Sequence, residues 1–101
     1  MSITQIQKGV AEAIREDPYG ASIRSVSLFG SFLSGKNKSD SDVDLLFETR
    51  RIMSLFQIGG IHYRLEQKLG RKVDFIPKNS LDKYIKKGVL SEAKIIYTSA
   101  D

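Results

Sequence analysis

The sequence contains no cysteine. Disulfide bonds and zinc sites built on thiolates are therefore excluded as sources of stability. No stretch approaches the roughly 20 apolar residues of a membrane-spanning helix, so no association with a membrane is expected. The N-terminus has neither a positively charged start nor a long apolar run. We therefore expect no signal peptide, and a cytoplasmic protein is the default expectation.

The chain has 101 residues, which fits a single domain over 1–101. Separate catalytic and substrate-binding domains have little room in this length, so a complete enzyme would need a partner chain or self-association. The formal net charge is +4. That charge would suit a nucleotide, an acidic protein or a nucleic acid, or simply a solvated surface rich in lysine. Direct binding of nucleic acid is not expected.

The start of the chain predicts an amphipathic helix over residues 3–16. Ser2 and Gln5 have the spacing of a capping box, and apolar residues then recur at helical intervals. The segment 17–20 contains proline and glycine and ends the helix. The later predicted elements are a strand at 25–29, a turn of helix in the polar loop 32–41, a strand at 43–47, a helix at 53–69, a strand at 72–76, a helix from about 80 to 87, and a strand at 94–97.

Two helices are expected to cover the sheet through apolar stripes. Gly70 is the predicted C-terminal cap of the helix at 53–69, and Gly59-Gly60 within it marks close packing or a kink. The expected inward side chains of this helix are Leu55, Ile58, His62, Leu65 and Leu69. In the helix that Ser80 would cap, the expected inward side chains are Leu81, Tyr84 and Ile85. Basic groups at 50–51, 68–72 and 83–87 are expected on solvated or partner-binding surfaces.

The segment 30–44 reads GSFLSGKNKSDSDVD and invites comparison with a phosphate-binding P-loop. Gly30, Gly35 and Lys36 match the glycines and lysine of that motif. However, Asn37 replaces the serine or threonine that binds magnesium. The chain then continues as a polar loop instead of the helix whose amides hold the phosphates. The P-loop interpretation therefore fails.

An EF-hand calcium loop is a second comparison. Asp40, Asp42 and Asp44 match its first, third and fifth positions. Leu45 stands where the turn needs glycine, and Arg51 stands where the loop needs a bidentate glutamate. A cation in place of this ligand excludes an EF-hand.

Asp42 and Asp44 fit a strand that presents alternate residues on one side. They would project together, about 6–7 Å apart along the strand, while Val43 points into the core. Two such carboxylates can hold a pair of divalent ions roughly 4 Å apart. Gly30 allows close approach of the backbone, and Ser31 offers a hydroxyl and an amide to a phosphate and can cap the short helix that follows. The alternative is a solvated loop edge.

A third carboxylate is expected from another strand. Asp74 is a lone charge in the apolar segment 73–76, where an unpaired carboxylate is costly. A metal ion or a reacting hydroxyl is a sensible partner, and exposure on an edge strand is the alternative. Asp40 is expected to be a loop residue. His62 has no second His or Cys nearby and is expected to be structural.

A Gly-Ser pair at 30–31, ten intervening residues and Asp-x-Asp at 42–44 together resemble the signature of the DNA polymerase beta-like nucleotidyltransferase superfamily. With Asp74, the match covers about residues 23–76, and 95–97 looks like the last strand of that family. The resemblance implies an α+β fold with a mixed sheet flanked by helices. The predicted elements give the order α-β-β-α-β-α-β.

The length resembles that of the minimal nucleotidyltransferase (MNT) proteins of bacteria and archaea. These proteins are commonly encoded with a helical HEPN-domain partner as a toxin–antitoxin pair. The resemblance implies binding of ATP with Mg²⁺, two ions being expected, and transfer of AMP to a hydroxyl. In antitoxins of the family, that hydroxyl belongs to a tyrosine of the HEPN ribonuclease toxin.

The resemblance also assigns the roles of site residues. Gly30 and Ser31 would hold the triphosphate. Asp42 and Asp44 would hold the magnesium ions. Asp74 would share one ion and help to deprotonate the acceptor hydroxyl.

One position departs from the family pattern. Members often carry an arginine just before the glycine of the spacer, where this chain has Ser34. Lys36 is expected to bind the nucleotide in its place, and Lys38 is the alternative. Two other functions stay open: a non-catalytic module that neutralises its partner by masking it, and transfer of AMP to a small molecule.

Overall fold

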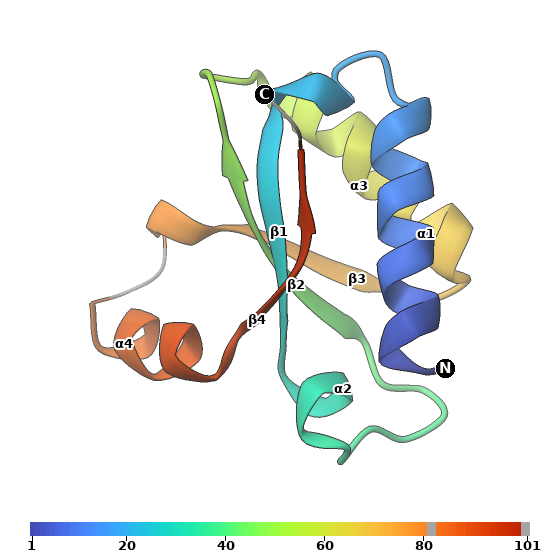
Figure 1. The fold of residues 1–101 in the computed structure, drawn as a ribbon, viewed down its shortest axis with the longest axis vertical. Coiled ribbons are helices and arrows are strands. Elements are labelled where there is room, and N and C mark those ends of the chain that lie inside the picture. The colour runs from blue at the N-terminus through green and yellow to red at the C-terminus, as the bar shows by residue number, and fades with distance from the viewer. Residues whose placement is uncertain (81–82, 100–101) are drawn as a thin grey trace.

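A four-stranded sheet with the strand order β3-β2-β1-β4 runs through the middle of the computed structural model (Figure 1). The structure describes residues 1–80 and 83–99. Within the second range, it describes the backbone but not the side chains of residues 83–87. Strand β1 is antiparallel to β2 and β4, whereas β2 and β3 are parallel. The predicted mixed sheet is therefore confirmed. The strands are β1 (Ile23–Phe29), β2 (Val43–Thr49), β3 (Val73–Pro77) and β4 (Lys94–Thr98).

Helices α1 and α3 pack against each other on one side of the sheet, while α4 lies on the other side (Figure 1). Parallel strands need a crossover connection, and α3 provides the one between β2 and β3. The element order α-β-β-α-β-α-β is confirmed, with a short α2 as the predicted turn of helix. The helices are α1 (Ile3–Glu16), α2 (Ser31–Ser34), α3 (Leu55–Leu69) and α4 (Lys83–Glu92), with 3₁₀ turns η1 (Gly20–Ser22) and η2 (Lys78–Ser80).

The ends of the two long helices follow from local sequence. Ser2 and Gln5 form the predicted capping box of α1. Ser54 and Gln57 form a second one, so α3 begins at Leu55, two residues later than predicted. Gly70 is the C-cap of α3, as predicted, with a left-handed φ of 66°.

Apolar side chains of α1, α3 and one face of the sheet meet in a continuous core. Alternate residues of the strands point toward the helices, and the opposite residues include the aspartates of the candidate site. The chief core residues are Ile6, Val10, Ala13, Ile14, Val26, Leu28, Val43, Leu45, Ile61, Leu65, Leu69 and Val73.

The predicted apolar stripe of α3 is wrong at its start. Leu55 is 86% exposed, and Ile61, absent from the prediction, is buried. The reason is that α1 ends level with the middle of α3, where Asp17 contacts Arg64 and lies beside Gly60. The first turn of α3 therefore extends past the layer that could cover it. The other predicted inward positions are buried or half-buried: Ile58, His62, Leu65 and Leu69.

The last helix runs further than predicted, because α4 ends at Glu92. Ser80 belongs to η2, where its hydroxyl donates to the carbonyl of Pro77 at 2.9 Å. Leu81 and the side chains of Tyr84 and Ile85 lie outside the described residues. Within the described ranges, no helix has the length and hydrophobicity needed to span a bilayer.

Candidate metal and nucleotide site

The parallel pairing of β2 and β3 brings two of the predicted carboxylates together. Asp44 on β2 lies in register with Asp74 on β3. Asp42 lies just before β2, two residues from Asp44. The pair at the start of the two strands is fixed by a hydrogen bond from the amide of Val43 to the carbonyl of Lys72 at 3.0 Å.

The electrostatics of Asp44 reflect this crowding. Burial, a hydrogen bond with Asp74 and the negative charges of Asp74 and Asp42 raise the pKa of Asp44 to about 6. Without a cation, Asp44 is protonated below about pH 6, and its proton can then be donated to Asp74 in this hydrogen bond. A divalent ion would relieve the same repulsion, and carboxylate oxygens are the ligands that Mg²⁺ prefers.

Gly30 lies directly against Asp44. It follows β1, where Phe29 pairs with Asp44. Its φ of 77° and ψ of −154° lie in a region that is essentially restricted to glycine. A Cβ at this position would overlap Oδ2 of Asp44. The predicted close approach of the backbone is therefore present, with the carboxylate itself as the neighbour.

The turn after Gly30 differs slightly from the prediction. Gly30 is the N-cap of α2, so Ser31 is the first helical residue and not the cap. The carbonyl of Gly30 accepts hydrogen bonds from Leu33 at 3.2 Å and Ser34 at 3.1 Å. The hydroxyl of Ser34 donates to the carbonyl of Ser31 at 3.3 Å. Lys36 is exposed just beyond this turn, and its side chain has no hydrogen bond or ion pair with a described residue.

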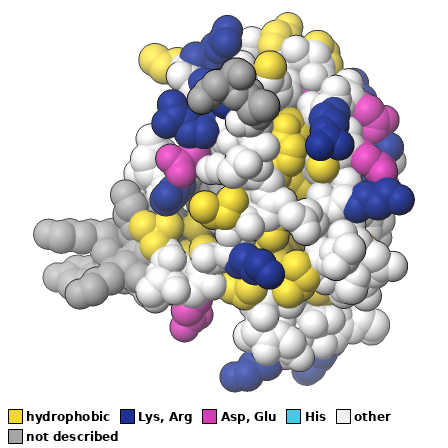
Figure 2. Space-filling view, in the orientation of Figure 1, with side chains coloured by type: hydrophobic (Ala, Val, Ile, Leu, Met, Phe, Trp, Pro, Cys, Tyr) yellow, Lys and Arg dark blue, Asp and Glu magenta, His cyan; other side chains and the backbone are white. Residues whose placement is uncertain are grey.

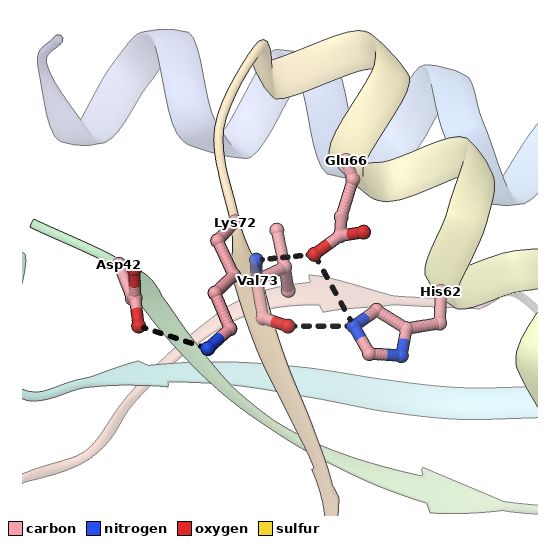
Figure 3. Close-up of polar contacts among 5 residues, drawn as sticks. All are labelled: Asp42, His62, Glu66, Lys72 and Val73. Carbon is pink, nitrogen blue, oxygen red and sulfur yellow. Dashed lines mark hydrogen bonds and ion pairs between the residues drawn. The ribbon is translucent and has the colours of Figure 1, made fainter. Parts of the chain in front are cut away.

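The remaining predicted carboxylate, Asp42, faces a lysine (Figure 3). Oδ2 of Asp42 lies 4.0 Å from Nζ of Lys72. Among the described residues, no three His, Asp or Glu side chains are grouped closely enough to hold a metal ion in this arrangement. The Asp44–Asp74 pair could supply two carboxylates to a divalent ion, and a site with three ligands would require Asp42 to move closer to them.

Two residues of α3 that support Asp74 were not predicted in this role (Figure 3). Oε2 of Glu66 accepts a hydrogen bond from the amide of Val73 at 2.9 Å. Nε2 of His62 lies 2.6 Å from the carbonyl of Val73. Both outward-facing backbone groups of the residue before Asp74 are thus held by the helix. The prediction that His62 is structural is confirmed.

Arg71 is a further residue whose role was missed. Its guanidinium lies over the ring of Phe32, 5.1 Å from the centroid. Its Nη1 donates to the carbonyl of Ser41 at 3.2 Å, and the carbonyl of Ser39 is 3.5 Å away. Arg71 therefore ties α2 and the loop before β2 to β3. The basic run 68–72 concealed this residue, which had been expected on a solvated or partner-binding surface.

A sequence model of the nucleotidyltransferase domain family matches residues 8–96. The chain belongs to this family. As a nucleotidyltransferase domain it is similar to the protein adenylyltransferase MntA of Thermococcus cleftensis, with 41% identity over 70 residues. That match covers 69% of this chain and 71% of MntA.

Solved structures agree with the fold of this nucleotidyltransferase domain. A protein described as a minimal nucleotidyltransferase superimposes with a TM-score of 0.76 and 26% identity, covering 93% of this chain and 95% of that one. The complex of a tri-AMPylated Shewanella oneidensis HEPN toxin with its MNT antitoxin gives a TM-score of 0.68. The identity there is 15%, with 95% of this chain and 72% of the other covered. This second likeness concerns the fold alone.

Proposed function

We propose that this nucleotidyltransferase domain transfers AMP from ATP to a hydroxyl group of a partner protein, a tyrosine of a HEPN-domain toxin. The observation that carries the proposal is the register of Asp44 with Asp74, with Asp42 two residues ahead and Gly30 against Asp44. The similarity to MntA, a protein adenylyltransferase, supports the choice of AMP and of a protein acceptor.

The proposed reaction is an in-line displacement. The acceptor oxygen attacks the α-phosphorus of ATP, the bond to the β-phosphate oxygen breaks, and pyrophosphate leaves. Asp42, Asp44 and Asp74 would hold two Mg²⁺ ions, which lower the pKa of the acceptor hydroxyl and neutralise charge on the leaving group.

The chain's own residues then position the reactants and move the proton. Asp74 lies beside Asp44 and accepts the proton of the acceptor hydroxyl. Ser31 contributes a hydroxyl and the first helical amide of α2 to the triphosphate. Lys36 contributes a positive charge from the exposed loop, because Ser34 is uncharged. Asp44 must be ionised, so its raised pKa predicts low activity in acid.

A radiolabel experiment tests the proposal. The chain is incubated with ATP labelled on the α-phosphate, Mg²⁺ and the proposed HEPN-domain partner. We expect label on the partner, and its loss by at least about 10³-fold when Asp42→Asn and Asp44→Asn are combined, since a single transition-state contact is worth about 10²–10³. Asp40→Asn is the matched control, because Asp40 is an exposed loop carboxylate.

A masking module is the second candidate, and the Asp42–Lys72 pair favours it, because the lysine places a positive charge beside one of the three carboxylates. In that case the domain neutralises its partner by covering it. Neutralisation that survives the double change, with no label transferred by the wild type, would support masking. Label found in a small molecule instead would support the remaining alternative, transfer of AMP to a small-molecule acceptor.

A further inference from the structure

Large apolar side chains are exposed at the end of the molecule where α3 begins. Phe56 is 94% exposed and Tyr63, two turns later, is 63% exposed. Leu55 beside them is also exposed, and Tyr19, just before η1, is 49% exposed. We call these four residues the apolar end. Figure 2 shows hydrophobic side chains at the top of the molecule, where Figure 1 places η1 and the start of α3.

A cavity of about 670 Å³ opens in the apolar end, between the end of α1 and the outer side of α3. Tyr19, Phe56 and Tyr63 line it together with Ala13 and Gly60. The same surface thus offers both a projecting ring and a hollow of a size that could accept one. A monomeric protein rarely exposes contiguous apolar surface of this kind.

Gly60 lines this hollow, and neither Gly60 nor the adjacent Gly59 is explained by the packing of the chain itself. A Cβ at Gly59 would meet no atom within 4 Å, and one at Gly60 would meet only Oδ2 of Asp17, at 3.8 Å. Glycine weakens a helix relative to alanine. The space left by the missing side chains is therefore available to something outside the chain.

The charges that line the cavity are already balanced within the chain. Arg64 Nε pairs with Asp17 Oδ2 at 2.9 Å, and Lys68 Nζ pairs with Glu16 Oε2 at 2.6 Å. The surface therefore has no excess charge with which to attract a strongly acidic or basic partner. It can face an identical surface without repulsion, although the chain as a whole carries +4.

We infer that the apolar end is the interface of a two-fold dimer of this chain, in which each Phe56 enters the cavity of the other copy beside Gly60. A two-fold interface must be complementary to itself, which the ring, the hollow and the balanced charges all satisfy. At about 150–250 Å² for a fully exposed aromatic side chain, the four residues present roughly 500–600 Å². This is less than the ~800 Å² per partner of a standard interface and corresponds to a dimer that dissociates on dilution.

The dimer leaves the aspartate site of each copy open. Tyr19 and η1 come immediately before β1, whereas Gly30 comes immediately after it. The seven residues of β1 span roughly 20 Å. The inference therefore does not depend on the proposed transfer of AMP.

Sedimentation velocity of the chain alone tests the inference. We expect a dimer that dissociates on dilution, and at least a tenfold rise in the dissociation constant for Phe56→Ser. Ile95→Ser is the matched control, because Ile95 is exposed on β4, away from the cavity, and should dimerise like the wild type. Circular dichroism melting checks that both variants are folded.

Site-specific crosslinking gives an independent measurement, since the chain has no cysteine of its own. A cysteine introduced at Gly59 faces open space beside the proposed axis and should form a disulfide between two copies under mild oxidation. Lys36→Cys, in the exposed loop after α2, should not. A wild type that stays monomeric at several hundred micromolar overturns the inference, as does Phe56→Ser dimerising like the wild type. A monomer that uses these side chains only to bind the HEPN-domain protein overturns it as well.

Discussion

The two ends of β1 carry surfaces of opposite chemistry, and each is unfavourable for the chain in water by itself. After β1, carboxylates crowd around Gly30 and raise the pKa of Asp44. Before β1, rings such as Phe56 are left uncovered. A cation would relieve the repulsion between the carboxylates, and another protein surface would cover the rings. We therefore expect the stability of the chain to come from the buried core between these ends.

The largest expected effect is a difference in the loss of stability between a variant in the core and a variant in the apolar end. Ile61→Ala removes a fully buried side chain and should lower the free energy of unfolding by about 2–5 kcal/mol. Leu55→Ala, six residues earlier on the same helix, should change it by less than about 0.5 kcal/mol. Urea denaturation at low protein concentration measures both. Similar losses for the two variants would place Leu55 in the core and remove the contrast.

The next effect concerns the opposite end of β1, where Asp42, Asp44 and Asp74 lie near Gly30; we call this the carboxylate end. Gly30→Ala forces a side chain into a conformation restricted to glycine and against Asp44, so it should destabilise the fold by about 2–3 kcal/mol. Gly35→Ala is the control, because Gly35 also has a positive φ of 78° but faces open space. It should lose about 1 kcal/mol.

A double mutant shows how much of the loss of stability in Gly30→Ala comes from the clash with Asp44. Adding Asp44→Ala to Gly30→Ala removes the carboxylate that the new Cβ would meet. The two changes should therefore combine to a smaller loss than their sum, as a double-mutant cycle would measure. Additive losses would mean that backbone strain alone explains Gly30.

The charge on Asp44 should give the carboxylate end a pH dependence that the apolar end lacks. A carboxyl whose pKa is raised on folding favours the folded state while it is protonated. Stability without divalent ions should therefore fall as the pH rises from about 4 to about 6. After allowance for solvent screening, the contribution is about 1–2 kcal/mol.

The comparison of wild type with Asp44→Asn isolates this contribution. Other groups titrate too, and a hydrogen bond from Lys78 holds the pKa of Glu48 below its usual value, which acts in the opposite direction. Stability should fall more steeply over this range in the wild type than in the variant, and added Mg²⁺ should reduce the difference. Parallel pH curves would contradict the raised pKa.

The smallest expected effect involves Lys72. Its ammonium lies 4.0 Å from Oδ2 of Asp42 and opposes a cation there. Lys72→Ala should therefore strengthen binding of Mn²⁺ by about two- to fivefold at low salt, since an exposed contact of this length is worth about 1 kcal/mol or less. Lys36→Ala should leave the affinity for Mn²⁺ unchanged and lower the affinity for ATP. Calorimetric titration of each ligand distinguishes the two lysines.

The sequence predicted the carboxylate end far better than the apolar end. Asp42 and Asp44 lie two apart at a strand start, and a local alternation of residues is enough to place them on one side. The register of Asp44 with Asp74 could not be predicted, because the pairing of distant strands depends on how α3 crosses between them. Arg71 was likewise hidden, since its partners lie about 30 residues away in sequence.

The prediction for the start of α3 was wrong for a physical reason. Leu55 has the helical spacing of a core residue, and periodicity alone cannot tell whether another layer reaches it. The answer depends on where α1 ends relative to α3, which contacts such as Arg64 with Asp17 determine. Apolar residues that fit the period of a helix can thus belong to an interface.

The hydrogen bonds between α3 and the backbone of Val73 also affect whether another strand can pair with β3. An edge strand with unpaired backbone groups can recruit another chain. At Val73, Glu66 and His62 already occupy the amide and carbonyl that face outward from β3. An added strand would have to displace them, so the same contacts that support Asp74 also hinder the pairing of another chain with the start of β3.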